Sequence, residues 1–162
     1  MIILVEEKNP NAYEGKVVIV DASVLVDFVL ENSPRHNGAV RLFTFLLKHQ
    51  IRVRIPFHAA FEHMSAIRRN VWFEDGQQAP HARQDNQGLQ VQLFAVPIDN
   101  AFIERYPTVG LPYMKAGDLL YLAMAKADGA PLITEDQELY DKAQKAGITT
   151  FKVSEYVLMD NT

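Results

Sequence analysis

Short apolar runs alternate along the chain with longer amphipathic stretches, and this alternation predicts strands separated by helices. The run at 17–21, VVIVD, is uninterrupted and β-branched, as expected of a strand buried on both faces. Further strands are predicted at 51–55, 91–98, 131–134 and 149–153. Helices are predicted at 22–31, from 32–34 to 48, at 57–70, at 99–106, from near 118 to Gly129, at 136–146 and at 154–159. This order predicts a central, mostly parallel sheet in a three-layer α/β/α fold.

Two stretches do not follow the alternation. Residues 2–5 either form a small edge strand or trail, and the following NPNAYEG segment is turn-like. We therefore treat 1–16 as an N-terminal extension and 17–162 as a single domain. The polar stretch 73–88 contains glycine, proline and asparagine, which favours a loop or a frayed helical extension.

Composition narrows the class of protein. A chain of 162 residues with 48% hydrophobic residues suits one domain with its own core. The absence of cysteine excludes disulfides, zinc–thiolate sites and cysteine nucleophiles, and it fits a cytoplasmic location. No apolar run reaches the ~18 residues of a membrane span, and the acidic first residues do not resemble a signal peptide, so we expect no membrane association. The net charge of −4 argues mildly against a nucleic-acid partner, unless a bound cation offsets part of the negative charge.

Several familiar site chemistries lack their sequence signals. The chain contains no dinucleotide-binding or P-loop glycine pattern and no nucleophile elbow. Its five histidines show no zinc-site spacing. A phosphoaspartate protein is another possibility. Such a protein needs a second acid close to Asp21, and none lies within two residues of it.

Four acidic residues stand at the ends of strands or near helix starts. Asp21 ends the first apolar run, Glu62 lies on the helix after the second strand, and Asp118 and Asp136 open two later helices. Each has an ordinary explanation: Asp21 as a turn or N-cap residue, Glu62 as a solvent-facing side chain, Asp118 as a partner of the helix dipole. Asp136 fits the first turn of a capping box with Thr134 as N-cap and Gln137 at the third position.

Taken together, the four acids indicate more than capping. The crevice beyond the carboxyl ends of parallel strands is where open α/β sheets bind ligands. Carboxylates within about 4–6 Å of each other raise one another's pKa unless a cation lies between them. Oxygen ligands suit Mg²⁺ or Mn²⁺, and such ions support hydrolysis of phosphodiesters without a histidine or serine base.

Three segments resemble the motifs of PIN-domain ribonucleases, and within them the VapC-like toxins of type II toxin–antitoxin systems. They are VIVDASVLV, FHAAFEHMSAI and the more specific GDLLYLAMAKADGAPLITEDQEL. The resemblance covers about residues 17–153. It implies a metal-dependent endoribonuclease in which Asp21, Glu62, Asp118 and Asp136 are catalytic and hold Mg²⁺ or Mn²⁺. It also implies that Ser23 and Thr134 support the site with their hydroxyls.

The resemblance further implies RNA as substrate, a homodimer, and a small antitoxin protein that packs near the first helices. The very apolar helix at 22–30 is compatible with such a partner, and equally with burial in the core. Arg68, Arg69 and Lys115 are weaker candidates for phosphate contacts, with surface solvation as the alternative. Tyr113 and Trp72 could stack on bases, although packing is the expectation for both.

The chain departs from the VapC-like toxins in two ways, which weaken the toxin assignment. Sixteen residues precede its first predicted strand, where the toxins often begin almost at once, and the polar stretch 73–88 has the character of an insertion. A nuclease of RNA processing without an antitoxin therefore remains an alternative. So does a catalytically inactive binding or scaffold protein with the same fold.

Overall fold

The computed structural model describes residues 1–71 and 88–158. The predicted loop at 73–88 lies, up to residue 87, outside these residues. The strands are β1 (Ile2–Glu6), β2 (Val17–Val20), β3 (Arg52–Pro56), β4 (Val91–Val96), β5 (Leu132–Ile133) and β6 (Thr150–Phe151). The helices are α1 (Ala22–Val29), α2 (His36–Lys48), α3 (His58–Val71), α4 (Asn100–Arg105), α5 (Ala116–Asp128), α6 (Gln137–Lys145) and α7 (Val153–Leu158), with a 3₁₀ turn η1 (Pro10–Ala12).

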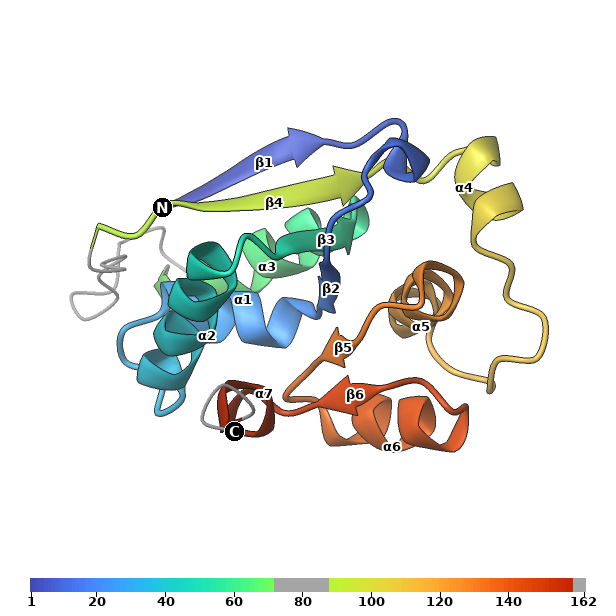
Figure 1. Cartoon of the computed structure of the whole chain (residues 1–162). Coiled ribbons are helices and arrows are strands. Elements are labelled where there is room, and N and C mark those ends of the chain that lie inside the picture. The colour runs from blue at the N-terminus through green and yellow to red at the C-terminus, as the bar shows by residue number, and fades with distance from the viewer. Residues whose placement is uncertain (72–87, 159–162) are drawn as a thin grey trace.

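The six described strands form one sheet in the order β1-β4-β3-β2-β5-β6 (Figure 1). Every described strand pairing is parallel, which confirms the predicted α/β fold class. From β2 the chain runs outward to β3 and β4, and it then returns to add β5 on the other side of β2. The strand order therefore reverses between β2 and β5, and a switch point of this kind is where a ligand crevice forms.

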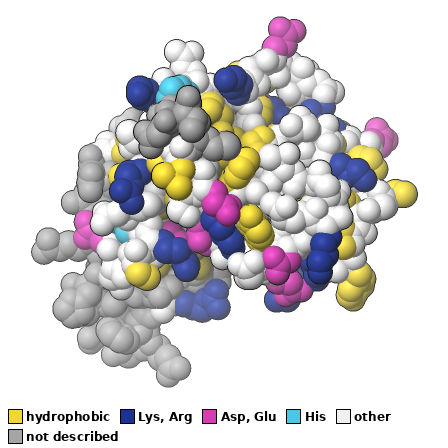
Figure 2. Space-filling view, turned by 60° about the horizontal axis from the view of Figure 1, so that its bottom comes forward, with side chains coloured by type: hydrophobic (Ala, Val, Ile, Leu, Met, Phe, Trp, Pro, Cys, Tyr) yellow, Lys and Arg dark blue, Asp and Glu magenta, His cyan; other side chains and the backbone are white. Residues whose placement is uncertain are grey.

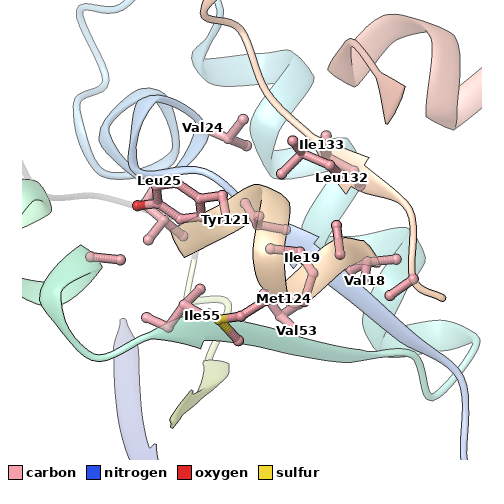
Figure 3. Packing of buried hydrophobic residues seen from close by; sticks show 14 of the residues in the cluster. Val18, Ile19, Val24, Leu25, Val53, Ile55, Tyr121, Met124, Leu132 and Ile133 are labelled. Carbon is pink, nitrogen blue, oxygen red and sulfur yellow. The ribbon is translucent and has the colours of Figure 1, made fainter. Parts of the chain in front are cut away.

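Helices cover the sheet and complete the core. Helix α5 packs against β2, β3 and β5, while α2 and α3 pack against β3 and α1 packs against both of them. On α1, Val24, Leu25 and Phe28 are fully buried (Figure 3). Of the two interpretations of this apolar helix, burial in the core explains its composition. Among the described residues, no helix has the length and apolar character needed to cross a membrane.

The start of α2 differs from the prediction. A helix beginning at Asn32-Ser33-Pro34 was expected, but α2 begins at His36. The reason is Asp27, which is buried on α1 and needs partners. Ser33 donates to Asp27 Oδ1 (2.6 Å) and Arg35 donates through Nε to Oδ2 (2.6 Å). These contacts hold 30–35 as a turn, so a tertiary demand overrides the local helix signal.

Strand β1 settles the question left open at the N-terminus. Residues Ile2–Glu6 pair in parallel with Val91–Ala95 of β4, so they form an edge strand. Directly after β1, buried Glu7 accepts from Arg54 Nε (2.7 Å) and from Arg52 Nη1 (2.6 Å). Arg54 also donates to Asp128 Oδ2 (2.7 Å) at the end of α5. The extension is therefore tied to the core through Arg54, a residue with only 2% of its surface exposed.

Candidate active site

The site lies at the carboxyl ends of β2 and β5, on either side of the switch point. These strands are direct neighbours, with Ile19 paired to Leu132 and Val20 to Ile133. Asp21 is the next residue after β2, and Thr134 is the next after β5. The pairing brings both to the same edge, although 113 positions separate them in sequence.

Asp21 occupies the N-cap position of α1, but its side chain makes no capping hydrogen bond. Instead, its Oδ2 accepts from the hydroxyls of Ser23 (2.7 Å) and Thr134 (2.8 Å). Burial raises the pKa of Asp21, the two hydroxyl bonds oppose that rise, and the charges of Glu62 and Asp136 add to it. The carboxylate is thus held in place by hydroxyls at a position where its charge is costly.

Thr134 does not act as the helix cap that the capping-box prediction assigned to it. Asp136 is the N-cap of α6 and accepts from Leu139 N (2.9 Å). Thr134 is fully buried. Its hydroxyl accepts a hydrogen bond from Asp136 N (3.0 Å) and donates one to Asp21 Oδ2. That prediction was wrong about where the helix starts: α6 begins at Gln137 with Asp136 as its N-cap, so the backbone N–H that bonds the Thr134 hydroxyl lies before the helix. Ser23 makes a parallel link, since its Oγ accepts from Glu135 N (3.2 Å).

Asp118 lies in the first turn of α5 and is half-buried. Its pKa is raised by burial first and then by the charges of Asp21, Asp136 and Glu62, with Lys115 as the opposing cation. Asp118 therefore lies within electrostatic range of the other three predicted acids. The interaction with the helix dipole that the sequence also suggested is compatible with this position.

Glu62 projects from α3 with 41% of its side chain exposed. Its Oε2 accepts from the Tyr121 hydroxyl (2.9 Å) and lies 3.4 Å from His58 Nε2. The pKa of Glu62 is lowered, chiefly by His58, against the effect of burial and with help from the Tyr121 bond. Glu62 is therefore held as a carboxylate by two neighbours that the sequence patterns did not single out.

The donor set fits a hard divalent cation. As the side chains lie, residues 1–71 and 88–158 contain no group of three or more histidine, aspartate or glutamate side chains arranged to hold a metal ion. Mg²⁺ usually takes only one or two carboxylates directly and keeps several waters, so it does not need three converging ligands. Burial is the main cause of the raised pKa of Asp118, and the repulsion from the other three acids, which adds to it, is what a cation among them would relieve.

Tyr121, His58 and Gly117 are the contributors that sequence reasoning missed. Tyr121 lies three residues after Asp118, and His58 lies four residues before Glu62. Residues at these spacings share a helix face, which is the signal that could have found them. Gly117 leaves room for Glu62, because a Cβ built there would lie 2.8 Å from Glu62 Oε1.

The weaker substrate candidates lie on the surface. Arg68, Arg69 and Lys115 are all exposed. Tyr113 is 97% exposed, so the expectation that it packs is wrong, and its ring is open to stacking. Trp72 lies outside the described residues. Acidic, basic and apolar side chains are interspersed on the face shown in Figure 2.

We expect Thr134→Val to weaken the site while preserving its shape. Valine keeps the volume but removes the hydroxyl that bonds both Asp21 and the backbone of Asp136. Loss of a group that orients a metal ligand typically costs about 10–100-fold in metal affinity or activity. Mn²⁺ titration and RNA-cleavage rates measure the effect.

The matched control is Thr150→Val. Thr150 is also buried, but its hydroxyl donates to the carbonyl of Ile148, two residues before it. This variant should give the same result as the wild type in both measurements. Equal activity of the Thr134 and Thr150 variants would contradict a role for the Thr134 hydroxyl.

The described strands form an all-parallel α/β sheet with acidic side chains near its switch point, and this architecture agrees with the family that the sequence matches. The chain belongs to the PIN domain family, whose model matches residues 18–145. No curated protein matches it in sequence.

Two solved structures have a similar fold. VapBC2 from Rickettsia felis, bound to a DNA fragment from its promoter, is 13% identical with a TM-score of 0.55; the match covers 84% of this chain and 98% of that one. VapC20 from Mycobacterium tuberculosis, described as a sarcin–ricin loop cleaving toxin, is 14% identical with a TM-score of 0.52, over 82% and 96% of the two chains. These similarities support the VapC-like resemblance at the level of the fold.

Proposed function

We propose that this protein is a metal-dependent endoribonuclease that hydrolyses phosphodiester bonds of RNA with Mg²⁺ or Mn²⁺. The observation that carries the proposal is the position of Asp21 at the carboxyl end of β2, bonded to Thr134 at the end of β5, with Asp118, Asp136 and Glu62 within electrostatic range. Four carboxylates at one edge of the sheet would repel a phosphodiester unless a cation neutralised them. A bound cation would therefore both stabilise the carboxylates and allow the negatively charged substrate to approach.

Asp21, Glu62, Asp118 and Asp136 would hold the ion, which when bound polarises a phosphoryl oxygen and makes water a better nucleophile. Ser23 and Thr134 keep Asp21 oriented through its Oδ2. Arg68, Arg69 and Lys115, which are exposed, would contact phosphates, and exposed Tyr113 would stack on an unpaired base. Single-stranded or looped RNA fits these contacts better than a regular duplex.

We further propose that the protein is the toxin of a toxin–antitoxin pair, acting in the cytoplasm as a homodimer. Support comes from the fold shared with VapBC2 and VapC20. Since the apolar side of α1 is used by the core, a protein partner needs other apolar surface, and Phe57, Phe61 and Met64 at the start of α3 are exposed. The alternatives are an RNA-processing nuclease without an antitoxin and an inactive scaffold protein.

The test is cleavage of a structured RNA by the purified protein in Mn²⁺, in Mg²⁺ and in EDTA. We expect cleavage with either metal and none after chelation, together with a higher melting temperature when Mn²⁺ is added. Cleavage that persists in EDTA would contradict metal dependence. A protein that neither binds metal nor cleaves RNA would favour the scaffold alternative.

A further inference from the structure

Tyr121 joins three of the four elements that supply the acids. It lies on α5, one turn after Asp118, and its side chain is completely buried. Figure 3 shows its ring among the apolar side chains of the core. Its hydroxyl donates to Glu62 Oε2 on α3 (2.9 Å) and accepts from the backbone N–H of Ala22 (3.3 Å). Ala22 is the first residue of α1 and directly follows Asp21.

The direction of these two bonds is fixed by the number of protons. A tyrosine hydroxyl has one proton, and a backbone N–H can only donate. The Ala22 N–H is one of the first-turn groups of α1 that have no partner within their own helix. The Ala22 N–H therefore donates to the Tyr121 oxygen, and the hydroxyl proton of Tyr121 points at Glu62.

We infer that Tyr121 is a positioning residue that acts through Glu62: its buried hydroxyl fixes that carboxylate toward the metal-binding acids and ties α3 to the start of α1. This inference rests on the proposed function. Glu62 needs such a support more than the other acids do, because it projects from the second turn of α3 with 41% of its side chain exposed. Without a partner, a long and exposed side chain of this kind samples many rotamers.

Gly117 completes the arrangement on the opposite oxygen of Glu62. A Cβ at position 117 would lie 2.8 Å from Glu62 Oε1 and 3.0 Å from His58 Nε2. The glycine therefore leaves the space that the positioned carboxylate occupies. It stands in the first turn of α5, where alanine would normally favour the helix.

The test is Mn²⁺ binding by isothermal titration calorimetry, with Tyr121→Phe as the main variant. We expect about 10–100-fold weaker Mn²⁺ binding, as for other losses of a ligand-orienting group. The Mn²⁺ concentration needed for half-maximal RNA cleavage should rise, while kcat at saturating Mn²⁺ stays near the wild-type value. The matched control is Tyr106→Phe, which removes another buried hydroxyl that donates to a carboxylate, Asp128 (3.4 Å). It should bind Mn²⁺ like the wild type.

Two further variants separate positioning from a general effect on folding. Gly117→Ala leaves the Tyr121 hydroxyl intact and should weaken Mn²⁺ binding without lowering the melting temperature. In a Glu62→Gln background, adding Tyr121→Phe should cause no further loss of Mn²⁺ affinity, because the two residues act as one unit.

Wild-type Mn²⁺ affinity in Tyr121→Phe would overturn the inference, and so would fully additive losses in the double variant. If the wild-type protein itself bound no Mn²⁺, the proposed function would fail along with it. If the wild type binds Mn²⁺ and Tyr121→Phe binds it equally well, the role of Tyr121 is refuted while the proposed function stands.

Discussion

Replacing Asp118 by asparagine is expected to abolish metal-supported RNA cleavage without unfolding the protein. The loss should be at least about 100-fold, since removal of a ligand costs no less than removal of a group that orients one. Asparagine keeps the size of the side chain and removes the charge that Asp21, Asp136 and Glu62 repel. The metal-free variant should therefore be as stable as the wild type or more so, and Mn²⁺ should no longer raise its melting temperature. Cleavage assays and thermal unfolding with and without Mn²⁺ measure both effects.

Glu138→Gln is the matched control for the helix-dipole explanation of Asp118. Glu138 is also an acid in the first turn of a helix, but it is exposed and bonds Lys142 on its own helix. Its neutralisation should leave cleavage unchanged and alter stability by less than about 1 kcal/mol. Retained cleavage in a well-folded Asp118→Asn protein would remove Asp118 from the site.

Arg54→Met is expected to be among the most destabilising single substitutions in the chain. Arg54 connects Glu7, Asp128 and the carbonyl of Pro10; its bonds to Glu7 and Pro10 are buried and its bond to Asp128 is part-buried. Methionine fills much of the volume but leaves two buried carboxylates without their main partner. Breaking a buried ion pair in this way costs about 3–5 kcal/mol, which urea unfolding would measure. The exposed pair of Lys142 and Glu138 supplies the comparison, because Lys142→Met should cost at most about 1 kcal/mol.

The same network makes stability depend on acid pH. Burial raises the pKa of Glu7, but the bonds from Arg54 and Arg52 outweigh it, and the net pKa lies below 4.5. A lowered folded-state pKa means that the unfolded state binds more protons in this range, so the contribution of Glu7 is complete above 4.5 and is lost as the pH falls through the lower value. A Glu7→Gln variant should be less stable at neutral pH and lose less on acidification. An unchanged acid profile would contradict this account.

Much of the fold follows from patterns that act over a few residues. The β-branched run before Asp21 predicts a buried strand, and Val18–Val20 are buried. The helix predicted at 99–106 is present as α4, and Asp99 caps it by accepting from Phe102 N. Gly129 ends α5 in a left-handed conformation, as its position after an amphipathic stretch implied. These features depend on side-chain periodicity and on local hydrogen bonds, which the sequence contains in full.

What the sequence could not decide is which distant groups a polar side chain meets in addition to its local partners. Thr134 accepts from the backbone N–H of Asp136 and also donates to Asp21, which lies 113 positions away. Ser33 donates to Asp27 of α1, where the local pattern predicted the start of a helix. Both hydroxyls bond buried carboxylates, which would be costly without hydrogen bonds.

The four acids show both levels at once. Their placement at strand ends and on helices was readable from the sequence, and it was enough to propose a metal site. Other features arise only when β2 pairs with β5 and α5 packs against the sheet. These are the electrostatic coupling of the acids, the hydrogen bonds from Ser23 and Thr134 to Asp21, and the hydrogen bond from Tyr121 to Glu62. Local chemistry determined which residues carry charge and which ends of elements they occupy; long-range packing determined which of them meet, because distance along the chain gives no measure of distance in space.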